Sequence, residues 1–285
     1  MKRARGVALL LVMWLTMLLA AVVGAFALNA QMEKLQGRTL SRGIVAAQAA
    51  RAGVEYALTR LADDDPRRQW LPDGRGYDWN FGGARVRIAV VDESGKVDLN
   101  SADVEMLSRL FIAAGVDRAQ AADLAGAIAD WRDPDDLVQP QGGAEDPAYA
   151  SAGLSWGAKD APFDTVAELE QVIGMTPAIY ASVAPYLTVY SGQMVPDAQF
   201  ADATVLQAMG IDPAPILEQR KGRGPAGANA PALGGGSGTY SIDSRARLPD
   251  GRQSVLRVVV RAGIGNIPGS AYTALRWEEG ASTTR

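Results

Sequence analysis

The sequence predicts an α+β protein, in which a helix-plus-sheet domain is interrupted by an inserted all-α domain. Three observations indicate this fold class. An apolar run at residues 7–28 continues into an amphipathic helical pattern that meets no proline before Pro66. Alternating, β-branched segments typical of strands occur at Ala84–Asp92 and again near the C-terminus. Between them, over residues 98–220, helical patterns and helix-capping residues dominate.

The N-terminal run has the length and composition of a membrane span. It follows a basic head at residues 1–6 and is broken only by Thr16 and Gly24. About 20 apolar residues cross a bilayer as a helix, and the basic head predicts a cytoplasmic N-terminus. Two alternatives stay open: an ordinary uncleaved anchor, and a secretory signal peptide cut after the small-x-small site Ala25-Phe26-Ala27.

The helical pattern does not end with the apolar run. Residues 29–61 are rich in Ala, Leu, Gln, Glu and Arg, with Gly37, Gly43 and Gly53 as weak points. We expect one long helix from Val7 to Leu61, apolar in its first half and amphipathic in its second. The alternative is a membrane helix, a break near Gly37 and a separate helix beyond it.

The remaining elements follow in order along the chain. The Pro-, Gly- and Asp-rich residues 63–83 predict a loop, and a strand and a turn follow it. A helix begins after Asn100 or Ser101, and a second one ends before Pro134.

Little periodicity is visible between residues 137 and 162. Two short helices are then expected, capped by Asp164 or Thr165 and by Thr176.

The C-terminal part predicts a return to the sheet. The low-complexity residues 221–238 read as a mobile Gly-rich linker. A hairpin then turns at Asp250-Gly251, and residues 272–280 add a last strand.

Composition narrows the function classes. The chain has 285 residues, a formal charge of −4, no cysteine and no histidine, so disulfides, triad hydrolases and zinc sites are not expected. Nucleic-acid binding is not expected either, because it depends on clustered Lys and Arg. Residues 97–132 do resemble a helix-hairpin-helix module. Their hairpin, residues 114–117, nevertheless has one Gly and carries Asp117 where a phosphate would lie.

Acidic residues gather in one central segment. They are Asp130, Asp133, Asp135, Asp136, Glu145, Asp146 and, further on, Asp160. Three interpretations compete: a solvated loop, an acid/base pair as in glycosidases, and an irregular calcium site. An EF-hand starting at Asp133 fails, because its sixth and twelfth positions are Val138 and Ala144.

A basic leader that ends in Gly, followed by an apolar and then an amphipathic helix, resembles the N-terminus of type IV pilins and pseudopilins. The resemblance implies cleavage between Gly6 and Val7 by a prepilin peptidase, with methylation of Val7. Most such subunits carry Glu at the fifth mature position, which here is Leu11. That absence, together with a helical domain inserted between pilin-like strands, resembles the GspK branch of the minor pseudopilins of type II secretion.

The resemblance also implies a division of the chain and a set of partners. Residues 1–6 would be the leader and 7–28 the transmembrane half of the helix. Residues 29–97 and 239–285 would form the type IV pilin-like part, in which the helix packs on an antiparallel sheet around the inserted domain at 98–220. Expected partners are the pseudopilins GspI and GspJ, with GspH as a further candidate, the major pseudopilin, the prepilin peptidase and the inner membrane.

A non-enzymatic role at the tip of the pseudopilus follows from the same resemblance, with the folded part in the periplasm. The alternative is an uncleaved, membrane-anchored periplasmic binding module. The resemblance also favours calcium over the other interpretations of the acidic segment. The candidate ligands are Asp133, Asp135, Glu145, Asp146 and Asp160.

Overall fold

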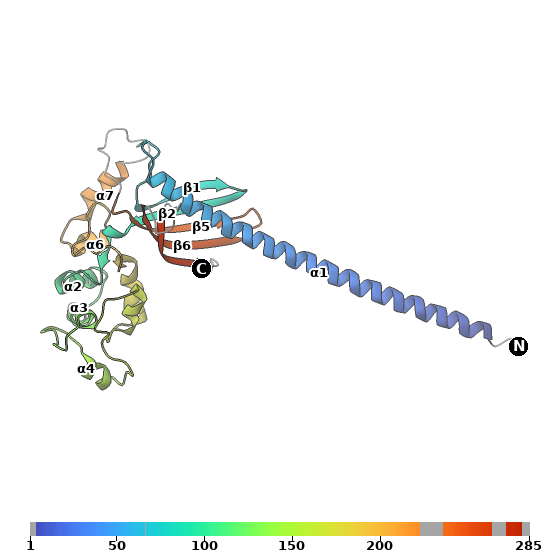
Figure 1. Cartoon of the computed structure of the whole chain (residues 1–285), viewed down its shortest axis with the longest axis horizontal. Helices are drawn as coiled ribbons and strands as arrows, with labels where there is room; N and C mark the ends of the chain where they lie inside the picture. Colours follow the sequence, from blue (N-terminus) through green and yellow to red (C-terminus); the bar gives the residue numbers. More distant parts are fainter. Residues whose placement is uncertain (1–3, 66, 223–235, 264–271, 281–285) are drawn as a thin grey trace.

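A computed structural model describes residues 4–65, 67–222, 236–263 and 272–280. One long helix lies along a five-stranded antiparallel sheet with its second half, and a block of short helices lies at the opposite end of the sheet from the N-terminus (Figure 1). The predicted α+β fold with an inserted helical part is therefore confirmed.

Helix α1 (Ala4–Leu61) is continuous, so the expectation of one long helix is confirmed and the alternative break near Gly37 is wrong. Its second half buries small side chains against the sheet, among them Ala50 and Val54. A Cβ at Gly53 would lie 2.3 Å from Ser244 Oγ. The sheet approaches α1 this closely because the contacting helix positions carry little or no side chain.

The sheet has the strand order β1-β2-β5-β6-β7, and every neighbouring pair is antiparallel. The inserted block enters between β2 and β5, which are paired in the centre of the sheet. The strands are β1 (Asp73–Phe81), β2 (Ala84–Asp92), β5 (Thr239–Arg247), β6 (Gln253–Ala262) and β7 (Tyr272–Gly280).

Strand β1 corrects the expectation of a loop over residues 63–83. Tyr77, Trp79 and Phe81 alternate along it, and Trp79 stacks on Tyr56 of α1 with 4.3 Å between the ring centroids. The turn at Gly82-Gly83 has φ of +58° and +79°, which suits the two-residue hairpin loop that joins twisted strands. Gly74, Gly76 and Asp78, which indicated a loop, lie at exposed positions of an edge strand.

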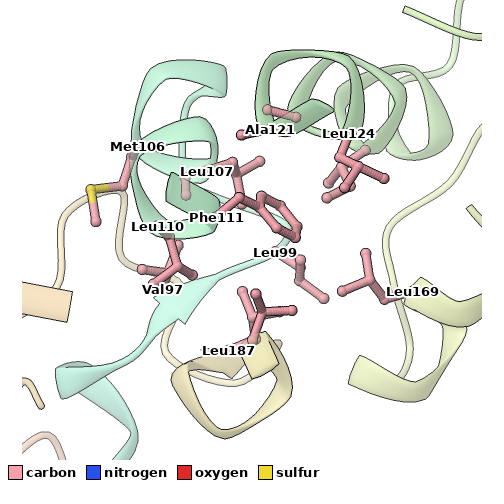
Figure 2. Close-up of a cluster of buried hydrophobic side chains, with 14 of the residues drawn as sticks. Val97, Leu99, Met106, Leu107, Leu110, Phe111, Ala121, Leu124, Leu169 and Leu187 are labelled. Carbon is pink, nitrogen blue, oxygen red and sulfur yellow. The ribbon is translucent and has the colours of Figure 1, made fainter. Parts of the chain in front are cut away.

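The inserted block packs short elements around one aliphatic and aromatic core. Leu99, Leu107, Leu110 and Phe111 are fully buried in it, and Figure 2 shows them meeting side chains from the other side of the block. The helices are α2 (Val104–Ala113), α3 (Arg118–Arg132), α4 (Asp146–Ser151), α5 (Pro177–Val183), α6 (Ala203–Ala208) and α7 (Pro213–Gly222). Between them lie η1 (Glu93–Gly95), η2 (Val166–Gln171), η3 (Ala184–Tyr186) and the parallel pair β3 (Val97–Asp98) and β4 (Leu187–Thr188).

Two local expectations in the block need correction. The N-cap of α2 is Asp103, whose side chain accepts from the Met106 N–H, and it is neither Asn100 nor Ser101. Asn100 is unavailable for capping because its amide exchanges two hydrogen bonds with the backbone of Phe163. The segment after Thr165 is a 3₁₀ turn where an α-helix was expected, although Thr165 caps it as expected.

Thr176 caps α5, as expected. Most of the predicted Gly-rich linker, residues 221–238, lies outside the described residues, as do the first three residues of the predicted leader.

Candidate functional site

The first half of α1 has no partner within the described chain. Its residues Leu9–Leu28 have a mean hydropathy of 2.5 and are all exposed, and by length and composition they could cross a membrane. Leu11 is among them, with 64% of its surface accessible. The backbone of Gly6 and Val7 is helical, but their side chains lie outside the description, so cleavage between them stays a prediction.

Asp130 anchors the acidic loop, which we define as residues 130–146. Its side chain is fully buried in the last turns of α3, and both carboxylate oxygens accept from the Gln139 N–H, at 3.2 and 3.3 Å. A Cβ at Gly143 would lie 2.5 Å from Asp130 Oδ2, so the loop folds back directly over this carboxylate. Asp130 thus shapes the loop, a role that the sequence did not assign to it.

Asp133 and Glu145 each leave one buried carboxylate oxygen, Oδ1 and Oε1 respectively, without a hydrogen-bond partner in the described part of the chain. Burial raises the pKa of Glu145 to about 7, and repulsion from Asp130, Asp133 and Asp160 adds to the rise. Burial also raises the pKa of Asp133, with repulsion from Asp135 as a smaller cause. Unpaired buried carboxylates are costly, and a cation is the natural group to neutralise them.

The other candidate ligands are engaged differently. Asp135 Oδ1 accepts from the Leu137 N–H at 2.9 Å, and Asp146 Oδ1 accepts from the Ala158 N–H at 3.1 Å, so both shape loops. Asp160 is exposed and has a φ of +53°. Within the described residues no three acidic side chains gather closely enough to hold a metal ion. The structure brings Asp133 and Asp160 within electrostatic reach of Glu145, and calcium binding stays a prediction.

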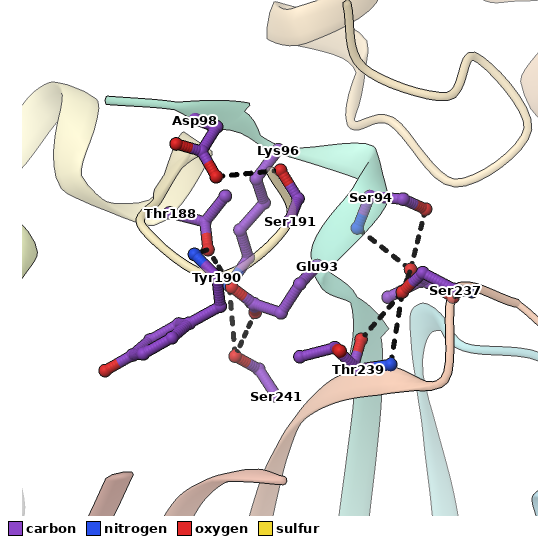
Figure 3. Close-up of polar contacts among 11 residues, drawn as sticks. Glu93, Ser94, Lys96, Asp98, Thr188, Tyr190, Ser191, Ser237, Thr239 and Ser241 are labelled. Carbon is purple, nitrogen blue, oxygen red and sulfur yellow. Dashed lines mark hydrogen bonds and ion pairs between the residues drawn. The ribbon is translucent and has the colours of Figure 1, made fainter. Parts of the chain in front are cut away.

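A second acidic cluster, which we call the polar junction, consists of Asp92, Glu93, Asp98 and their partners (Figure 3). All three carboxylates are buried, and they lie where β2 gives way to the helical block. Glu93 accepts from Lys96 Nζ at 2.5 Å, and also from the hydroxyls of Thr188 and Ser241. It therefore joins a strand of the helical block to a strand of the sheet.

The neighbouring acids of the polar junction extend the same connection. Asp92 accepts from the Ser237 N–H at 2.7 Å, at the start of the returning chain. Asp98 accepts from the Gly192 N–H at 2.8 Å, within the helical block. Carboxylates that accept several hydrogen bonds are satisfied without a metal, so this cluster holds the block against the sheet. From the sequence, residues 92–95 indicated only a turn.

Comparison with known proteins gives one family and several relatives. Residues 88–192 match the family model described as "Type II secretion system (T2SS), protein K". A "Putative type II secretion system protein K" of Escherichia coli (strain K12) is 27% identical over 204 residues, which are 65% of this chain and 62% of that protein. A type II secretion system protein K of Klebsiella pneumoniae is 26% identical over 206 residues, with the same two coverages. The match thus spans less than two thirds of these relatives.

The fold comparison extends over more of the chain. A chain from the crystal structure of the GspK-GspI-GspJ complex of enterotoxigenic Escherichia coli matches with a TM-score of 0.62 at 15% identity. The match covers 87% of this chain and 100% of that one. The expected resemblance to the K proteins of type II secretion is confirmed.

Proposed function

We propose that this chain is a minor pseudopilin of the K type, a structural subunit that initiates and caps the pseudopilus of a type II secretion system. The observation that carries the proposal is α1, whose apolar first half is entirely exposed while its second half supports a pilin-like sheet. The match of residues 88–192 to the K family supports the same conclusion.

The proposed mechanism is packing. The apolar half of α1 anchors the chain in the bacterial inner membrane, with the N-terminus in the cytoplasm and the folded part in the periplasm. The same half of α1 then joins the helix bundle of the fibre, together with the helices of the GspI and GspJ type subunits. GspH and the major pseudopilin lie on the side of the fibre nearer the membrane. The helical block occupies the position where a further subunit would stack, and so ends the fibre.

Leu11 fits this position in the fibre. A carboxylate within an apolar helix bundle is costly unless a positive charge pairs with it, and in this family that charge is the terminal amine of a neighbouring subunit. A subunit at the end of the fibre lacks a neighbour on one side. It can therefore carry an apolar residue at the fifth mature position.

Co-expression with a prepilin peptidase, followed by the intact mass of the purified protein, tests the proposal. We expect a chain that begins at methylated Val7 and that co-purifies with the I and J type pseudopilins. A chain that keeps residues 1–6 would contradict it and support the alternative, an uncleaved membrane-anchored binding module. A chain that begins near Leu28 would indicate a cleaved signal peptide.

We also propose that calcium binds at the acidic loop. The unpaired buried oxygens of Asp133 and Glu145 support this, and Asp160 could add a third carboxylate. Asp135 and Asp146 each use Oδ1 to accept one backbone N–H, so their Oδ2 atoms remain as candidate ligands. When bound, the ion supplies positive charge and no chemistry, because it is redox-inert and acts here only as a structural cation.

Calcium titration of the full chain in detergent tests this part. At 100 times the dissociation constant a bound ion adds about 2.7 kcal/mol, which corresponds to a rise of roughly 5–10 °C in melting temperature. Asp133→Asn should abolish the rise, whereas Glu105→Gln, at an exposed position of α2, should keep it. No rise in the unmodified protein would overturn the calcium site.

A further inference from the structure

The hydrophobic cores of the two parts do not merge. Leu107, Leu110 and Phe111 belong to the cluster inside the block, and Val54 and Ile88 belong to the cluster between α1 and the sheet. Within the described part of the chain, no buried side chain belongs to both clusters. Two parts without a shared core can move relative to each other unless other contacts fix them. The direction of the block relative to the sheet therefore depends on polar contacts.

Glu93 reaches both parts with one rigid group. Its Oε1 accepts from the Ser241 hydroxyl of β5 in the sheet, and its Oε2 accepts from the Thr188 hydroxyl of β4 in the block (Figure 3). The two oxygens of a carboxylate have fixed relative positions, so bonds to both of them define a distance and an angle between their partners. Lys96 Nζ, at 2.5 Å from Oε1, balances the charge.

A hydrogen bond nearer the surface also joins the sheet to the block. Arg75 Nη2 of β1 donates to the carbonyl oxygen of Arg220, in the last turn of α7, at 2.8 Å. The Arg75 side chain is also held by Asp73 and is 26% exposed, so water competes for its bonds. The Glu93 side chain is 1% exposed. Hydrogen bonds are stronger in such a buried position, so Glu93 is the stronger of the two connections.

The sheet surface beside the junction is not covered by the block. A pocket of about 150 Å³ lies there, and its lining residues all belong to β5, β6 and β7, among them Ser241, Arg276 and Glu278. Tyr190 of the block lies within electrostatic reach of Arg276 and Glu278. The block therefore faces this surface without filling the pocket, which leaves room for it to turn.

We propose that Glu93 is the positioning residue that fixes the direction of the helical block, and that the block turns as a unit about the polar junction when this carboxylate is lost. In some proteins a buried polar group specifies one arrangement more than it adds stability. The consequence for capping rests on the proposed function, because a block that ends the fibre must lie where a further subunit would stack.

Distances between pairs of spin labels test the proposal on the purified full chain in detergent. The chain has no cysteine, so two introduced cysteines carry the only labels. The spanning pair is Asn80→Cys with Arg118→Cys, which joins exposed positions of β1 and α3. Two within-part pairs report whether each part stays folded. They are Gln48→Cys with Asn80→Cys for the α1–sheet part, and Arg118→Cys with Glu170→Cys for the block.

Removing the carboxylate should loosen only the spanning distance. In Glu93→Ala we expect the distribution of the spanning distance to broaden by about twofold, with both within-part distances unchanged. Glu93→Gln keeps an acceptor oxygen and gains an amide donor for the two hydroxyls, so it should keep the narrow distribution. Asp98→Asn is the matched control, because this buried carboxylate of the same cluster accepts from the Gly192 N–H and the Ser191 hydroxyl, both in the block. It should leave the spanning distance unchanged.

A second variant keeps Glu93 and removes its hydroxyl partners. Thr188→Val combined with Ser241→Ala leaves the carboxylate with Lys96 and should also broaden the spanning distance. This variant decides the question if Glu93→Ala disturbs the within-part distances. A narrow spanning distance in either variant, once the within-part distances show that it is folded, would overturn the proposal. Equal broadening in Asp98→Asn would overturn it as well.

Secretion by a complemented deletion strain measures the consequence for capping. Glu93→Ala should lower secretion by about fivefold or more, although the chain is still cleaved by the peptidase and still co-purifies with the I and J type pseudopilins. Normal secretion from a chain with a broadened spanning distance would overturn the link between block direction and capping. An unmodified chain that keeps residues 1–6 would contradict the proposed function instead, and the distances would still decide the role of Glu93.

Discussion

The α1–sheet part and the helical block of this chain build their hydrophobic cores from different kinds of side chain. In the α1–sheet part the helix contributes mainly Ala and Gly to the contact, while the sheet supplies Val and Ile. The first half of α1 remains exposed. The helical block closes on itself around large side chains such as Phe111, Trp131 and Tyr149. The α1–sheet part therefore leaves an apolar helix surface uncovered, whereas the helical block has a hydrophobic core of its own.

Under the proposed function, this difference would let one chain both join and end an assembly. The exposed apolar half of α1 requires a bilayer or other helices around it, so it favours association. The block has one apolar core of its own, around Leu107, Leu110 and Phe111. The polar junction at Glu93 connects the two parts, and the block lies at the end of the sheet distant from the apolar half of α1 (Figure 1).

The largest expected effect comes from emptying the core of the helical block. Phe111→Ala removes a fully buried ring and should lower the free energy of unfolding of the block by about 4 kcal/mol. Hydrogen exchange of the full chain should show faster exchange in α2 and α3 and unchanged exchange in β5 and β6. Equal loss of protection in both parts would contradict two separate cores.

A small-to-large substitution tests the close contact between α1 and the sheet. Gly53→Leu places a side chain where even a Cβ would meet Ser244 Oγ and Val86, so we expect a loss of about 3 kcal/mol in β2 and β5, measured by the same exchange experiment. Gly43→Leu is the matched control on the same helix, because no atom lies within 4 Å of its added Cβ. It should stabilise α1 by up to about 1 kcal/mol. Equal effects would mean that the close contact at Gly53 is unimportant.

A smaller effect concerns pH and is confined to the block. The pKa of Glu145 is about 7 in the folded chain, against 4.5 for an ordinary Glu, so the folded state binds this proton more tightly than the unfolded state. In calcium-free buffer the melting temperature of the block should therefore rise as the pH falls from 8 to 5. Glu145→Gln should reduce that rise, and Glu105→Gln should not. An unchanged pH profile in Glu145→Gln would contradict the burial of an uncompensated carboxylate.

The smallest expected effect is at Leu11. If the helical block, and not the missing carboxylate, keeps the subunit at the fibre end, then Leu11→Glu should be tolerated. Secretion of the system's substrates in a complemented deletion strain measures this, and we expect a level within twofold of the unmodified chain. Val7→Glu is unsuitable as a control because it alters the predicted cleavage site, so Leu15→Glu serves as the matched change within the apolar half of α1. A loss of secretion in Leu11→Glu but not in Leu15→Glu would contradict the claim that the helical block keeps the subunit at the fibre end.

Much of the fold could be predicted from local patterns. The bounds of β2, the hairpin of β5 and β6, the continuous α1 and the caps Thr165 and Thr176 follow from alternation, turn residues and capping chemistry. Strand β1 could not be recognised by composition, because its Gly and Asp residues are typical of loops. The alternation of Tyr77, Trp79 and Phe81 before two glycines was the signal that would have revealed it.

Local sequence patterns could not predict the roles of the individual site residues. The acidic segment was visible as a cluster, but its sequence could not distinguish Asp133 and Glu145, which have unpaired buried oxygens, from Asp135, which shapes a turn. The polar junction was missed because Glu93 bonds to partners 95 and 148 residues away, Thr188 and Ser241. Only the folded chain brings such groups together.

The position of this chain in assembled fibres tests the central claim most directly. A C-terminal epitope tag, gold-labelled antibody and electron microscopy of isolated pseudopili would report it. Our account predicts one label per fibre, always at the same end, because the helical block prevents another subunit from stacking above it. Labels distributed along the shaft would contradict the account, since they would show that subunits assemble on both sides of this chain.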